Sequence, residues 1–92
     1  MKETFEGNFC GALDSDQRFQ KWQLRPVGQT EPIECLLQKA NGPSYEFYEN
    51  EQMTVTGKRI NVYGVPGNIE PSALPLVVES FWTPRFSLRI IG

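Results

Sequence analysis

The most informative segment of the chain is Met53-Thr-Val-Thr-Gly-Lys-Arg-Ile-Asn-Val-Tyr63. Its threonines and valines favour a strand, because β-branched side chains pack well on a pleated surface. Gly57 stands in the middle, and a lone glycine inside a strand usually marks a bulge or a corner. The segment therefore predicts a strand over residues 53–63 that bends at Gly57, as the strands of a small barrel must bend.

Length and composition predict a single globular domain over residues 1–92, with its core over residues 4–82 and a C-terminal extension at 83–92. The 9 basic and 11 acidic residues give a formal net charge of -2, so any nucleic-acid site must be a local patch. No apolar run is long enough to span a membrane, and no signal peptide is visible. We expect a cytoplasmic protein with no membrane partner.

The sequence carries no motif for metal binding or catalysis. It has no histidine, and Cys10 and Cys35 lack metal-binding spacing. We expect both cysteines to act as small apolar residues, with a disulfide between them as the alternative. The carboxylates of Asp14 and Asp16 are expected to cap backbone amides in a turn. No serine or cysteine adjoins a plausible base, so we expect no metal, no cofactor and no enzymatic activity.

Alternating apolar residues and turn formers divide the remaining chain into strands. Residues 18–25 could begin a helix, but Pro26 would stop it within two turns, and a period of two favours a strand with Trp22 and Leu24 facing inward. Ile33, Cys35 and Leu37 are expected to meet them from the next strand. The predicted strands are residues 4–13, 18–25, 33–39, 53–63 and 76–82, with 86–91 as a short extra strand or an extended tail.

The connector over residues 45–51 is acidic and aromatic, and two structures fit it. It could form a short helix that is capped by Ser44 and packs Phe47 and Tyr48 inward, or it could be an extended link. The sequence leaves this choice open.

Taken in order, five segments resemble the oligonucleotide/oligosaccharide-binding (OB) fold over residues 5–82. They are Phe5-Glu-Gly-Asn-Phe-Cys-Gly-Ala-Leu13, Phe19-Gln-Lys-Trp-Gln-Leu24, Ile33-Glu-Cys-Leu36, Glu51-Gln-Met-Thr-Val-Thr-Gly-Lys-Arg59 and Leu76-Val-Val-Glu-Ser-Phe81. The resemblance implies an all-β, five-stranded Greek-key barrel whose first and fourth strands turn corners at Gly7, Gly11 and Gly57. The short connector and the long proline-rich loop at 64–75 depart from the family pattern.

The resemblance also implies a binding surface along strands two and three and in the loops beside them. No acidic residue lies between positions 17 and 30. Cations can follow phosphates while aromatic rings stack on bases. The predicted nucleic-acid-binding residues are Phe19, Lys21, Gln23 and Arg25 on the outer face of the second strand, with Arg18 beside them, and Lys58, Arg59 and Tyr63 further along the chain. The alternative is an ordinary solvated strand face, with Phe19 closing the end of the barrel.

Two functions follow from this interpretation. The first is a small non-catalytic module that binds single-stranded nucleic acid through these residues. The second is a protein-interaction or assembly module that uses the proline-rich loop and residues 86–91 to bind another protein or a second copy of itself.

Overall fold

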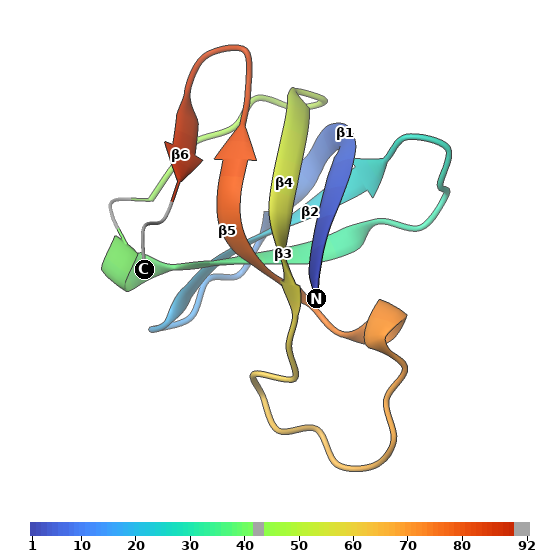
Figure 1. Ribbon diagram of the computed structural model, residues 1–92. Coiled ribbons are helices and arrows are strands. Elements are labelled where there is room, and N and C mark those ends of the chain that lie inside the picture. The colour runs from blue at the N-terminus through green and yellow to red at the C-terminus, as the bar shows by residue number, and fades with distance from the viewer. Residues whose placement is uncertain (42–43, 90–92) are drawn as a thin grey trace.

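The computed structural model describes residues 1–41 and 44–89, which form a closed ring of hydrogen-bonded strands (Figure 1). The strands run in the order β3-β2-β1-β4-β5-β6, and a parallel pairing of β3 with β5 closes the ring. Every other pairing is antiparallel. The elements are β1 (Lys2–Leu13), β2 (Phe19–Pro26), β3 (Ile33–Gln38), the 3-10 turn η1 (Lys39–Asn41), β4 (Gln52–Arg59), the 3-10 turn η2 (Pro71–Ala73), β5 (Leu76–Trp82) and β6 (Ser87–Arg89).

The all-β prediction is confirmed, and each predicted strand is present, although the strand predicted at 53–63 ends earlier than expected. Residues 18–25 form a strand rather than a helix. The short extra strand predicted at 86–91 is β6, which pairs with β5, while residues 90 and 91 lie outside the described part of the chain.

The long strand β1 serves two neighbours because it bends at Gly7. Its first half pairs with β4 from Lys2 to Asn8, and its second half pairs with β2 from Gly7 to Leu13. A β-carbon at Gly7 would collide with the carbonyl oxygen of Arg25, so the approach of the two strands requires glycine there. A register shift just before Gly11 marks a second irregularity, as the sequence predicts.

Gly57 bends β4 as the sequence predicts. The register between β4 and β5 shifts between Thr56 and Gly57, and a β-carbon at Gly57 would collide with the carbonyl oxygen of Val77. The predicted end of this strand at Tyr63 is wrong, because β4 stops at Arg59. The side chain of Asn61 accepts a hydrogen bond from the Val65 N–H at 3.0 Å and donates one to the Val65 carbonyl at 2.9 Å, which turns the chain into a loop.

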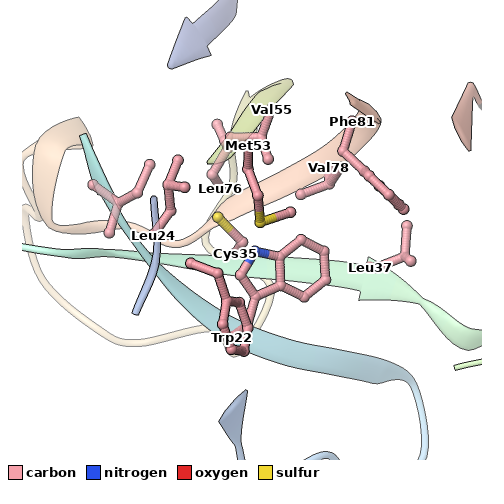
Figure 2. Packing of buried hydrophobic residues seen from close by; sticks show 11 residues of the cluster. Trp22, Leu24, Cys35, Leu37, Met53, Val55, Leu76, Val78 and Phe81 are labelled. Atoms are coloured by element: carbon pink, nitrogen blue, oxygen red, sulfur yellow. The ribbon is translucent and has the colours of Figure 1, made fainter. Parts of the chain in front are cut away.

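The core fills the inside of the ring, where side chains from β2, β3, β4 and β5 converge (Figure 2). The predicted inward faces of β2 and β3 are confirmed: Trp22 lies opposite Cys35, and Leu24 lies opposite Ile33. Both cysteines are free, and burial raises the pKa of the Cys35 thiol to about 12. The buried core consists of Phe9, Trp22, Leu24, Ile33, Cys35, Leu37, Met53, Val55, Leu76, Val78 and Phe81.

The connector before β4 is extended over residues 44–48 and contains no helix. The side chain of Gln20 makes the hydrogen bonds to the connector that a neighbouring strand would otherwise make. Its amide donates to the Tyr45 carbonyl at 2.6 Å and accepts from the Tyr45 N–H at 2.9 Å. The connector packs the rings of Tyr45 and Phe47 against the core, with the Phe47 ring 5.0 Å from that of Trp22. Tyr48 points outward and remains 64% exposed. The extended alternative is therefore the one observed.

Candidate nucleic-acid interface

The loop between β1 and β2 is organised by Asp16. One carboxylate oxygen accepts hydrogen bonds from the backbone N–H groups of Arg18 at 2.7 Å and Phe19 at 2.8 Å. The other oxygen accepts one from the Tyr63 hydroxyl at 3.0 Å and lies 3.2 Å from Lys21 Nζ. These donors, with the Phe19 N–H first, hold the pKa of the Asp16 carboxyl well below its usual range. The expected capping role of Asp16 is confirmed.

Tyr63 joins the loop after β4 to the loop between β1 and β2. The guanidinium of Arg18 lies 5.7 Å from the centre of the Tyr63 ring, and Lys21 Nζ lies 4.9 Å from it. Arg18 also donates a hydrogen bond to the Val62 carbonyl at 3.1 Å. Tyr63 as a residue is 44% exposed and lies beside two cations.

Phe19 does not offer the open ring that the sequence predicts, because it is only 2% exposed. Strand alternation places Phe19 on the outer face of β2, whereas Trp22 and Leu24 face the core. Tyr63 covers Phe19 there, because it lies edge-on to the Phe19 ring at a centroid distance of 6.4 Å. Arg18 lies over the same ring at 5.0 Å. The expectation of a stacking role for Phe19 is therefore wrong, since the loop after β4 covers this end of the strand.

Lys21, Gln23 and Arg25 follow one another along the outer face of β2, as predicted. Lys21 and Gln23 are half-buried and Arg25 is exposed. At about 3.3 Å per residue, Arg25 lies about 13 Å along the strand from Lys21. The face is not free of acid, because Gln23 pairs across the strands with Glu34 of β3.

Arg59 and Lys58 do not join this surface. Arg59 forms an ion pair with Glu3 at 3.3 Å and donates to the carbonyls of Ser72 at 3.2 Å and Leu74 at 2.6 Å. Its guanidinium is therefore used to hold the long loop against β1. Lys58 is exposed and lies between Lys2 of β1 and Val77 of β5 in the sheet.

Lys39 is a cation that sequence reasoning missed. Its backbone N–H donates to the Arg18 carbonyl at 2.8 Å, which places it directly beside the β1–β2 loop. The register of the β2–β3 pair could have predicted this position, because Phe19 lies opposite Gln38 and Lys39 is the next residue. We call the group of Arg18, Lys21, Lys39 and Tyr63 the Tyr63 surface.

Two hollows of about 300 Å³ border the Tyr63 surface. The first lies beside Arg18 and is lined by Gln17, Phe19, Gln38 and Ala40 as well. The second lies beside Lys21, between β2 and the connector. Its walls include Gln20, Trp22, Tyr45, Phe47 and Tyr48.

Comparisons with known proteins give no assignment: no protein-family model matches the chain, and no curated protein matches it significantly. Within residues 1–41 and 44–89, no helix is long and apolar enough to cross a membrane. The same residues contain no cluster of three or more side chains of the types His, Cys, Asp and Glu that could hold a metal ion.

Proposed function

We propose that this chain is a non-catalytic OB-like module that contacts single-stranded nucleic acid at the Tyr63 surface. The ring order, with β1 shared between β2 and β4 and with β3 beside β5, supports a Greek-key barrel of this class. OB folds bind their ligands beside the loops that follow the first and fourth strands. In this chain those two loops meet through Asp16 and Tyr63.

The observation that carries the proposal is the partly exposed aromatic residue Tyr63 beside the cationic groups of Arg18 and Lys21. A base that stacks on such a ring contributes about 1–3 kcal/mol, whatever its identity. The neighbouring cations lie where the phosphates of the same strand would pass. Lys39 is exposed and its backbone N–H bonds to the Arg18 carbonyl, so its charge can reach the same loop, whereas the Asp16 carboxylate pairs with Lys21.

Arg25 and Gln23 extend the proposed path along β2, away from the loops. They lie on the outer face of the strand, and Arg25 is exposed. Three or four neutralised phosphates give a salt dependence of about −2 to −3 in log affinity against log salt concentration for a single strand. The proposed binding is therefore modest in strength and strongest at low salt.

Fluorescence anisotropy with short labelled DNA and RNA single strands at low salt tests the proposal. Tyr63→Ala is expected to weaken binding about tenfold because it removes the stacking ring. Tyr63→Phe keeps the ring and is expected to retain most of the affinity. Trp82→Ala is the matched control, since Trp82 on β5 is exposed to a similar extent, 46% against 44%, and lies outside the Tyr63 surface. Absence of binding at tens of micromolar protein would rule the proposal out.

A further inference from the structure

The first half of β1 has one unpaired edge. Its residues from Lys2 to Asn8 pair with β4 on one side, whereas pairing with β2 on the other side begins only at Gly7. Figure 1 shows this half of β1 beside β4 with no strand along its outer side. Among the described residues, no strand therefore covers the edge of β1 before Gly7.

The free backbone groups on this edge can be assigned. The carbonyl of Glu6 accepts a hydrogen bond from the Val27 N–H at 2.8 Å, so it points away from β4. Backbone groups in a strand alternate in direction with every residue. The N–H and carbonyl groups of Thr4 and Lys2 therefore point the same way as the Glu6 carbonyl, toward the uncovered side. Such a row of donors and acceptors matches another extended backbone.

We propose that this edge pairs with the same edge of a second copy of the chain, in an antiparallel and two-fold symmetric arrangement. Val27 already occupies the place opposite Glu6, so the pairing must use Lys2 and Thr4. The register that satisfies their groups places Lys2 opposite Thr4 of the second copy, and Thr4 opposite its Lys2. Each of these two pairs then exchanges two hydrogen bonds.

Charges on the outer face favour this partner. Lys2, Thr4 and Glu6 share that face by strand alternation. In the proposed register, Lys2 of each copy lies diagonally beside Glu6 of the other, within reach of a long side chain. Glu6 forms no ion pair within the described chain, and Lys2 reaches only Glu79, at 3.6 Å. The attraction in the two Lys2–Glu6 contacts outweighs the repulsion between the two Lys2 side chains, which approach each other once.

The edge also has an apolar part. A hollow of about 520 Å³ lies beside it, lined by Phe5, Pro26 and Val27 together with the polar residues Thr4, Glu6 and Gln29. The same register places Met1 opposite Phe5 of the second copy, on the side of this hollow. Met1 is fully exposed and Val27 is 75% exposed, so the pairing would bury the most exposed large apolar side chains of the described chain. Glu3 meets its counterpart at the centre, but each Glu3 is already paired with an Arg59.

Sedimentation velocity over a concentration series up to the millimolar range tests this pairing. The intact chain is expected to show a dimer that grows with concentration. Thr4→Pro removes an N–H that no bond within the ring uses, so it is expected to weaken the dimer about tenfold or more without unfolding the chain. Thr4→Val is the matched control: it loses the 2.9 Å hydroxyl contact with Thr56 but keeps the N–H, and it should dimerise as the intact chain does.

A charge exchange gives a second and independent measurement. Lys2→Glu and Glu6→Lys are each expected to weaken the dimer, and the double variant should restore it. A chain that stays monomeric at millimolar concentration overturns the proposal. So does a dimer that Thr4→Pro leaves unchanged in a variant whose thermal unfolding shows it to be folded. The nucleic-acid titration is independent of this result, because the Tyr63 surface includes no residue of β1.

Discussion

Two clusters of similar chemistry connect the loops of the ring. Each contains an acidic residue, a basic residue and a tyrosine. In the first, Asp16 holds Lys21 and Tyr63 and joins the β1–β2 loop to the loop after β4. In the second, Glu51 holds Arg85 through two short hydrogen bonds of 2.6 and 2.7 Å. The Arg85 guanidinium lies 3.9 Å from the centre of the Tyr48 ring and joins the β5–β6 hairpin to the connector.

The two clusters differ in the sign of the charge around them. The Arg85 cluster lies in the connector with the acids Glu46, Glu49 and Glu51, and Arg85 also donates to the Glu46 carbonyl at 2.9 Å. The Asp16 cluster has a second cation, because the Arg18 guanidinium lies 5.7 Å from the centre of the Tyr63 ring, and the backbone of the exposed Lys39 bonds to Arg18. Similar contacts thus serve structure at both places, but only the Asp16 cluster leaves positive charge available for a polyanion.

The largest difference is expected in stability. Phe47→Ala removes a ring that the connector packs 5.4 Å from both Phe9 and Phe81, beneath the Arg85 cluster. Because the ring is half-buried, we expect a loss of about 2–3 kcal/mol in the free energy of unfolding, below the roughly 3–5 kcal/mol typical of a fully buried ring. Tyr63→Ala removes a residue that is 44% exposed, so it should cost less, about 1–2 kcal/mol, although its contacts with Asp16 and Phe19 are lost. Urea unfolding measures both, and equal losses would show that Tyr63 contributes as much to the fold as the core ring of Phe47.

Acid should weaken both clusters. The Phe19 N–H and the other donors lower the pKa of Asp16 from 3.8, and Arg85 lowers the pKa of Glu51 from 4.5. A carboxyl whose pKa is lower in the folded state stabilises the fold above its unfolded pKa, and that stability is lost as the pH falls through the folded value. Thermal unfolding between neutral pH and about pH 2 should therefore show a loss that begins near these ordinary values.

The asparagine and glutamine variants separate the two contributions to this loss. Asp16→Asn and Glu51→Gln lower stability at neutral pH, and each should flatten the acid dependence because neither amide titrates. If both variants kept the full acid loss of the intact chain, other carboxyls would be responsible for it.

Local chemistry is enough to predict most of the ring. Gly57 could be predicted as the bend of β4 because a lone glycine in a strand allows the neighbouring strand, here β5, to approach closely. The inward positions of Trp22 and Leu24 follow from strand alternation alone. Predictions of this kind succeed because they depend on the period and the type of adjacent residues.

The candidate site was harder to predict because distant residues decide it. Phe19 is buried by Tyr63, which comes from a loop that the sequence predicts to be part of a strand. Arg59 forms an ion pair with Glu3, which is distant in the sequence. The absence of acids between positions 17 and 30 was misleading, since Asp16 and Glu34 both reach the outer face of β2. A face predicted from one strand omits the charges that its neighbours bring.

The smallest expected effect is on nucleic-acid affinity, and it distinguishes the Asp16 cluster from the Arg85 cluster most directly. Asp16→Asn keeps an oxygen acceptor for the N–H groups of Arg18 and Phe19. It removes the charge that neutralises Lys21 and the oxygen that accepts from the Tyr63 hydroxyl. We expect the affinity for a short single strand to rise about threefold at low salt, and the gain to disappear at high salt because it is electrostatic. The matched change in the acidic cluster, Glu51→Gln, should leave the affinity unchanged. A folded Asp16→Asn variant that binds no tighter than the intact chain would contradict the expected gain from freeing the charge of Lys21.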